Sequence, residues 1–226
     1  METSLSKFEL SQYLSNQLNN YFPDGNIVKP RNIVSIVELA LERISICLSA
    51  FTLTRYKKDG KPYFDHLISD AYMLFLCYLA NSVWHETNDS SLSSKIYYLN
   101  KAMHSFDCKY DHDLPEIFLI IHGAGTVMGK AEYGNYFVVF QGCTIGESQG
   151  HYPKIGNGVA ITANSSAIGK CKIGDRATVG FRTTLMRKNV PNDHTAFMDP
   201  ETGTVQVIKT LMCYAQQFFN IDLKTL

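Results

Sequence analysis

The chain has 226 residues, of which 45% are hydrophobic and 12% aromatic, so it can bury a core and is neither collagen-like nor disordered in composition. Its 21 basic and 21 acidic residues balance, which excludes the strong positive charge typical of proteins that bind nucleic acid or anionic membranes. The longest apolar stretch, residues 71–80, is too short to span a bilayer, and the polar N-terminal segment lacks the apolar core of a signal peptide. We therefore expect a soluble, cytoplasmic protein without a membrane span or a nucleic-acid partner.

The N-terminal half begins with the apolar spacing of a helix. Between Ile33 and Phe51 the apolar residues step by three or four positions, which places them on one face of a helix. The sequence DGKP at 59–62 predicts a break, because glycine and proline interrupt helical structure.

Two further helices are predicted in this half. Residues 66–85 are apolar on most sides, as expected for a largely buried helix. A polar turn at 87–91 offers residues that cap helices, and a helical pattern resumes from Leu92 to about Met103. We therefore expect an α-helical domain over residues 1–106.

Six cysteines are scattered along the chain without a C-x-x-C pair. They are Cys47, Cys77, Cys108, Cys143, Cys171 and Cys213. We expect reduced thiols, some of them buried as small apolar residues. A disulfide framework or metal ligation is the less favoured alternative, because both use closer and more regular spacings.

The C-terminal half follows a period of six instead. Every sixth residue from Ile121, with four residues added after Ile145, gives eleven positions, of which nine are Ile, Val or Leu. The eleven positions are Ile121, Val127, Tyr133, Val139, Ile145, Ile155, Ile161, Ala167, Ile173, Val179 and Leu185. Many are followed by glycine, and in the later repeats the residue four positions on is small or of modest size: Val159, Ser165, Cys171, Ala177 and Thr183. A helix cannot generate this period, which is typical of a hexapeptide repeat.

Hexapeptide repeats predict a triangular prism. Each hexad supplies a short strand and a corner, three hexads close one coil, and stacked coils pair their strands into parallel sheets around a continuous core. The aliphatic and small residues point inward, and glycine-rich corners permit backbone angles that are costly for other residues. The added four residues predict that 147–153 leave the coil as a loop, where functional groups are often held. The prism is expected over 107–203, followed by a tail at 204–226 that packs on a coil as a helix.

Two segments, HGAGTVMGKAEYGNYFVVFQGCTIG at 122–146 and HYPKIGNGVAITANSSAIG at 151–169, resemble the serine acetyltransferase family of hexapeptide acyltransferases. The resemblance implies an α+β fold in which an N-terminal α-helical domain precedes a left-handed parallel β-helix. It also implies an acetyl-CoA-dependent O-acetyltransferase that transfers acetyl directly to a hydroxyl. The resemblance is strong over about 105–198, whereas over the helical half it rests on domain order and on the stretch around Asp65.

His122 matches the catalytic histidine of that family. Because it follows Ile121, which is expected to point inward, its side chain should point outward at a corner of the coil. An imidazole with a pKa of about 6.5 is suited to removing a hydroxyl proton at neutral pH. The resemblance also implies an upstream aspartate that orients the histidine. We assign Asp113, with Asp111 as the alternative. In the family the aspartate lies further upstream of the catalytic histidine than either residue does here, and for Asp113 the difference is closer to one hexad.

Acceptor recognition rests on three matches and two departures. His151 matches the histidine of the family's His-Pro-Lys-Ile loop, Lys154 supplies a nearby cation, and Asp65 loosely matches an acceptor-binding aspartate of the helical domain. The family aspartate before the catalytic histidine is Ile121 here, and the arginine before the loop histidine is Gly150. These changes weaken the case for free serine and make a sugar or surface-polysaccharide precursor the alternative acceptor.

The resemblance implies acetyl-CoA as the donor substrate and no metal ion. Pantetheine is expected in a groove between neighbouring β-helices, where small residues leave room and basic residues near the last coil meet the phosphates. The positions assigned to the donor are Gly142, Thr144, Ala163, Phe181, Arg187 and Lys188, of which Phe181 replaces a small residue. Cys143 is not expected to carry an acyl group, because its hexad position points it into the prism.

Two other functions remain open. A zinc enzyme of the γ-carbonic anhydrase type needs three converging histidines, but after His122 and His151 the next is His194. A non-catalytic scaffold is the second alternative, because flat prisms associate readily. We expect a homotrimer through the β-helices with each active site between protomers, or a dimer of such trimers.

Overall fold

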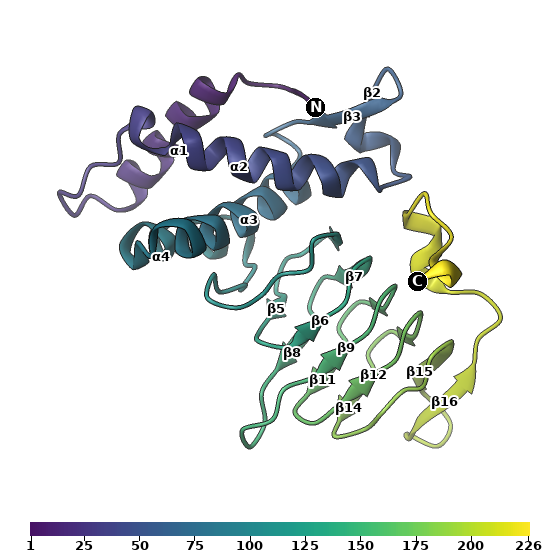
Figure 1. Ribbon diagram of the computed structural model, residues 1–226. Coiled ribbons are helices and arrows are strands. Elements are labelled where there is room, and N and C mark those ends of the chain that lie inside the picture. The colour runs from purple at the N-terminus through teal and green to yellow at the C-terminus, as the bar shows by residue number, and fades with distance from the viewer.

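The computed structural model describes residues 1–226 and places four helices against one end of a column of short parallel strands (Figure 1). The helices are α1 (Lys7–Tyr21), α2 (Pro30–Ser49), α3 (Ser69–Thr87) and α4 (Ser90–His104). Their buried faces join the interior of the first coil in one continuous core. No helix combines the length and the apolarity that a membrane crossing requires.

Capping residues set the starts of two helices. Ser6 and Glu9 form a capping box at the start of α1, in which each side chain accepts the backbone N–H of the other residue. Asp89 Oδ1 accepts the N–H of Leu92 at the start of α4. The three helices predicted from apolar spacing are confirmed as α2, α3 and α4, whereas that spacing does not predict α1, whose signal is the capping box.

The break predicted at 59–62 is the turn of a small hairpin. Strands β2 (Lys57–Lys58) and β3 (Lys61–Phe64) pair antiparallel after the short helix η1 (Thr54–Tyr56), and β1 (Glu2–Thr3) pairs parallel to β3. Asp59 and Gly60 both have positive φ, the backbone that a two-residue hairpin turn favours. This small sheet leads directly into α3.

The C-terminal half is a parallel β-solenoid with three faces, and the predicted fold class is confirmed. One face contains β4 (Phe118–Ile121), β7 (Phe137–Phe140), β10 (Ala160–Ile161), β13 (Thr178–Val179) and β15 (His194–Met198). The second contains β5 (Val127–Met128), β8 (Thr144–Gly146), β11 (Ser166–Ile168) and β14 (Thr184–Met186). The third contains β6 (Glu132–Tyr133), β9 (Lys154–Ile155) and β12 (Lys172–Ile173).

The hexad pattern predicts the interior of the solenoid correctly from Val139 onward. Each predicted inward residue from Val139 to Leu185 is at most 4% exposed. The small residues four positions later are buried as well, at 2% exposure or less. The narrow prism therefore has room for one aliphatic and one small side chain in each hexad.

The first coil departs from the predicted register. Its strand pairing places Ile120 and Met128 at the inward positions, so the expectation that Ile121 and Val127 point inward is wrong. Met128 is fully buried and Val127 is 37% exposed. Ile120 and Met128 are eight positions apart, whereas the repeat gives six, so the corner between them carries two extra residues. This enlarged corner, residues 122–125, breaks the period just where the side chain assigned as the base lies.

The hexad glycines are required mainly by close approach between coils. Gly156 lies against the next coil: a Cβ there would be 2.5 Å from Asp175 Oδ1 and 2.8 Å from Asp175 N. Gly146 occupies the same hexad position, but a Cβ there would meet nothing within 4 Å. Neither has a positive φ. The left-handed backbone that glycine permits occurs at other positions of the coils, among them Gly142, Gly158, Asn164 and Arg182.

This contrast predicts different effects of the same substitution at the two positions. Gly156→Ala forces a backbone shift and should lower the free energy of unfolding by about 1–3 kcal/mol, as overpacking does. Gly146→Ala should be neutral or raise it by up to about 1 kcal/mol, because alanine restricts the unfolded chain. Urea unfolding of both variants measures the difference, and equal effects would show that inter-coil contact is not what selects glycine.

The C-terminal tail returns along the solenoid to the helical half (Figure 1). After β16 (Val205–Lys209), which pairs antiparallel with β15, the chain forms two short helices, η2 (Tyr214–Phe218) and η3 (Leu223–Thr225), rather than one longer helix. Phe219 is 2% exposed and its ring lies 5.8 Å from Phe51 and 5.2 Å from Tyr136, centre to centre. Asn220 donates its N–H to Ala50 O. The tail thus joins the end of α2 to the solenoid.

Candidate functional site

One edge of the prism gathers four of the nine residues that the sequence assigns to catalysis and donor binding. Successive coils are joined here by backbone hydrogen bonds from Gly142 N to Ala124 O, from Asn164 N to Gln141 O and from Arg182 N to Ala163 O. We call the corner residues 122–125, 141–142, 163–164 and 181–182 the catalytic edge. It contains the assigned residues His122, Gly142, Ala163 and Phe181.

His122 lies on the enlarged corner with its side chain exposed. Its φ of 52° is a left-handed conformation that costs a non-glycine residue roughly 1–2 kcal/mol. The next residue, Gly123, packs tightly: a Cβ there would be 2.6 Å from Ile120 Cγ2 and from Met73 Sδ. Packing against α3 therefore holds the corner in its strained conformation and leaves the imidazole on the outer surface.

Charged groups of the helical half surround this corner. Asp70, in the first turn of α3, accepts the backbone N–H of His122 with an N···O distance of 3.3 Å. The same oxygen, Oδ2, lies 3.6 Å from Arg55 Nη2. Burial lowers the pKa of nearby His104, and its contact with Asn100 and the negative charge of Asp70 offset this only in part.

A second edge carries the predicted loop. Residues 147–153 form a tight hairpin in which Ser148 and His151 exchange backbone hydrogen bonds of 3.0 and 3.1 Å. Its central residues, Gln149 and Gly150, both have positive φ, as in a type I′ turn. His151 is exposed at the base of this turn. Gly150 suits this turn, because glycine adopts a positive φ without strain.

This second edge also holds the basic pair assigned to the donor phosphates. Arg187 donates its N–H to Ile168 O on the coil beside the hairpin, and Lys188 Nζ donates to Val205 O. Lys154 lies on the following face, where it pairs with Glu132 at 2.5 Å. Thr144 lies on β8, between the two edges. Within one chain the structure therefore places the His122 corner and the His151 hairpin at opposite ends of the β5–β8–β11–β14 face.

The structure does not bring Asp113 or Asp111 to His122. The backbone carbonyls of Tyr110 and His112 in this segment accept hydrogen bonds from Asn81 Nδ2, near the C-terminal end of α3. The His122 corner meets Asp70, 11 residues earlier on that helix, which is about 16 Å along the helix axis. Asp111 pairs with Lys109, and Asp113 is exposed.

A different carboxylate lies beside the strand that leaves the corner. Asp107 forms a parallel bridge with Val127, and its carboxylate accepts hydrogen bonds from Tyr97 Oη at 2.7 Å and Lys101 Nζ at 2.6 Å. Burial raises the pKa of Asp107, but the bonds from Lys101 and Tyr97 outweigh burial and the net pKa is lowered. Asp107 lies one hexad upstream of Asp113. This is about the amount by which the family's separation between aspartate and catalytic histidine exceeds the separation between Asp113 and His122.

Asp65 has a local structural contact. Its Oδ1 accepts the N–H of Leu67 at 2.9 Å in the turn before α3. The acidic side chain that reaches the catalytic edge from this stretch is Asp70, five residues later in the same FDHLISD segment. Sequence reasoning missed this contact, because an acidic residue near the start of a helix is common and does not indicate a distant partner.

The cysteines are all free thiols, and Cys213 is the one that is not fully buried. Burial raises the pKa of Cys143, whose Sγ contacts Thr162 O at 3.1 Å inside the prism. A buried, protonated thiol is a poor nucleophile. The inward orientation expected for Cys143 is therefore confirmed.

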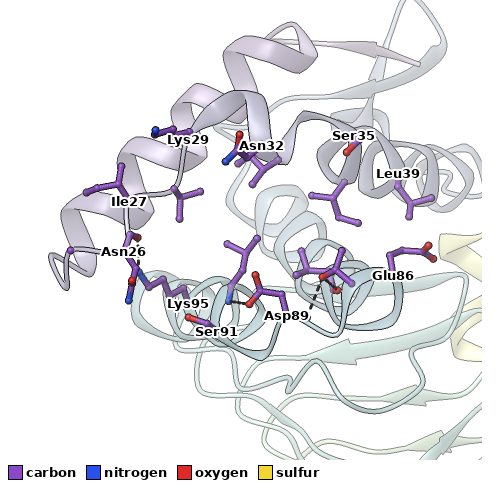
Figure 2. A pocket seen from close by; sticks show the side chains of 17 residues that line it. Asn26, Ile27, Lys29, Asn32, Ser35, Leu39, Glu86, Asp89, Ser91 and Lys95 are labelled. Atoms are coloured by element: carbon purple, nitrogen blue, oxygen red, sulfur yellow. Dashed lines mark hydrogen bonds between the residues drawn. The ribbon is translucent and has the colours of Figure 1, made fainter.

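A cavity of about 780 Å³ lies in the helical half, away from both edges (Figure 2). The α1–α2 connection, α2, the end of α3 and the start of α4 line it. Lys95 enters from α4, and its Nζ bonds Asp24 Oδ1 at 2.8 Å and Asn26 O at 3.1 Å. Because these groups satisfy the buried amine, the cavity carries no reactive arrangement comparable to the His122 corner.

Solved structures share this arrangement of helices and solenoid. Serine acetyltransferase from Neisseria gonorrhoeae matches 93% of this chain and 81% of its own, with a TM-score of 0.69 and 21% identity. The chain has the fold of the serine acetyltransferases. A serine acetyltransferase in complex with CoA matches 88% of this chain and 83% of its own, with a TM-score of 0.64 and 19% identity. The N. gonorrhoeae enzyme in complex with serine matches 86% and 82%, with a TM-score of 0.66 and 23% identity.

Comparison with protein-family models gives no match, and comparison with curated proteins gives no significant one. At 19–23% identity the structural likeness establishes the fold. Activity must be argued from the groups on the two edges.

Proposed function

We propose that the protein is an acetyl-CoA-dependent O-acetyltransferase of the serine acetyltransferase type, with His122 as general base. The observation that carries this proposal is one exposed imidazole on an enlarged corner of a fold shared with serine acetyltransferases. One of those relatives was solved with CoA bound, which supports acetyl-CoA as the donor substrate.

The reaction follows from the position of the imidazole. His122 takes the proton of the acceptor hydroxyl, whose oxygen then attacks the thioester carbonyl. Backbone N–H groups of the glycine-rich corners stabilise the negative charge that develops on the carbonyl oxygen. His122 returns the proton to the leaving thiolate, so acetyl passes directly to the acceptor without a covalent enzyme intermediate.

We propose that the donor groove lies between two copies of the solenoid. Gly142 and Ala163 present little side chain along the catalytic edge, whereas Phe181, 61% exposed, stands out from it. Arg187 and Lys188 lie on the other edge of the same face, so a second copy would bring their charges and the His151 hairpin toward His122. We therefore place each active site at the seam of a homotrimer; a monomer in light scattering would contradict this.

The acceptor carries a hydroxyl, and two classes compete. The relative solved with serine supports an amino-acid acceptor. The apolar, 6% exposed Ile121 beside His122 and the turn residue Gly150 offer neither a carboxylate nor a guanidinium to such an acceptor. Those two positions favour a sugar hydroxyl as the second candidate.

Release of free CoA thiol from acetyl-CoA tests the proposal. Purified protein is assayed with L-serine, neutral sugars and nucleotide sugars, and each product is identified by mass spectrometry as the O-acetyl compound. Acceptor-dependent release with L-serine supports the serine type, and release with a sugar alone supports the second candidate. The absence of acceptor-dependent release across the panel would overturn the enzyme proposal in favour of a scaffold.

A further inference from the structure

We propose that Asp70 is a positioning residue that fixes the His122 corner from the helical half. The inference rests on the proposed function, in which His122 is the base, and adds a residue that no hexad repeat contains. Its basis is the hydrogen bond between Asp70 Oδ2 and the backbone N–H of His122.

The contact is unlike an ordinary helix cap. Asp70 lies in the first turn of α3, but α3 has no side-chain cap bond, and Asp70 reaches a residue 52 positions away. Its side chain is 11% exposed, so the carboxylate is largely withdrawn from water. A buried carboxylate needs compensation by charge and hydrogen bonds, and the Arg55 guanidinium at 3.6 Å together with the His122 N–H supplies it.

The corner needs such support because it is strained and has no repeat neighbour on one side. His122 has positive φ, and the two extra residues take it out of the ladder that fixes the later corners. Side chains pack closely on this corner at Gly123, from Met73 of the same helix and from Ile120. Asp70 and Met73 are one turn apart, so a single turn of α3 anchors the corner by one polar and one apolar contact.

The consequence is that the helical half sets the position of the base. If α3 moves relative to the first coil, the N–H of His122 loses its acceptor and the left-handed corner can relax. Small misplacement of a catalytic group has a large kinetic effect, because the reacting atoms must be aligned. Asp70 therefore acts on turnover through His122.

Two nearly isosteric variants test this role. Asp70→Asn keeps an oxygen that can accept the His122 N–H, whereas Asp70→Leu has a similar shape and no acceptor. We expect Asp70→Leu to lower kcat about 10-fold or more with KM for acetyl-CoA unchanged, and Asp70→Asn to keep kcat within about threefold of wild type. Near-wild-type kcat in Asp70→Leu, or equal losses in both variants, would overturn the proposal.

Amide hydrogen exchange gives a readout that does not depend on activity. The peptide containing residues 118–125 should exchange faster in Asp70→Leu than in wild type and Asp70→Asn, while peptides of the later coils stay unchanged. Unchanged exchange at 118–125 would overturn the positioning role whether or not the protein acetylates an acceptor. Altered exchange in a protein that transfers no acetyl group would support the structural contact and refute the proposed function alone.

Discussion

His122→Ala should lower turnover by at least about 10²-fold, because loss of a general base typically has an effect of that size. The exposed side chain makes no hydrogen bond within the chain, so its removal should leave folding intact. The measurement is the initial rate of CoA release at saturating acetyl-CoA and acceptor. The matched control is His85→Ala, an exposed histidine in the last turn of α3, which should keep wild-type turnover. Near-normal turnover of His122→Ala would remove the histidine from the mechanism.

The same assay ranks the two carboxylates that compete to orient the imidazole. Asp107→Asn should reduce turnover more than Asp113→Asn, because Asp107 bridges to Val127 beside the catalytic corner, while Asp113 belongs to the segment held near Asn81. The reverse order would return this role to Asp113.

Phe219→Ala should lower the free energy of unfolding by about 3–5 kcal/mol, the usual cost of removing a fully buried phenylalanine side chain. Phe219 is 2% exposed between Phe51 of the helical half and Tyr136 of the solenoid. Its loss leaves a cavity at the point where the tail joins the two halves. Denaturant unfolding followed by circular dichroism measures the effect.

Phe8→Ala is the matched control for this substitution. Phe8 lies on α1 with 54% of its surface exposed, so the same change should alter stability by no more than about 0.5 kcal/mol. A loss below about 1 kcal/mol in Phe219→Ala would show that the tail is not a packed part of the fold.

The solenoid could be predicted because its signal is local and repeated. A period of six recurs through Val139, Ile161 and Val179, and each repeat occupies the same place in the prism. The first coil differs from the predicted register, because its corner contains two extra residues and the apolar run at 118–121 fits two registers equally well. Only the pairing with the next strand distinguishes Ile120 from Ile121.

In the candidate site, too, some residues could be located from the sequence and others could not. His122 and the hairpin at 147–153 stand out in the sequence as a motif and as an interruption of the repeat, so both could be located without coordinates. The carboxylates near the His122 corner could not be located in this way. Across an irregular segment such as 107–117, the number of residues between two positions does not determine how far apart their side chains lie. The resemblance favours Asp113 because the family spacing differs from that of Asp113 by about one hexad, and the structure leaves this segment near the far end of α3.

The sequence alone determined that this chain is a helical half followed by a stacked prism with an exposed imidazole, because hydrophobic period and motif are properties of neighbouring residues. The tertiary structure alone decided the register of the first coil and which acidic side chain contacts the backbone of the His122 corner. Asp70 reaches His122 across 52 residues, and this contact exists only once α3 has packed on the first coil. Long-range contacts of this kind depend on the packing of whole elements, for which no local pattern in the sequence supplies a signal.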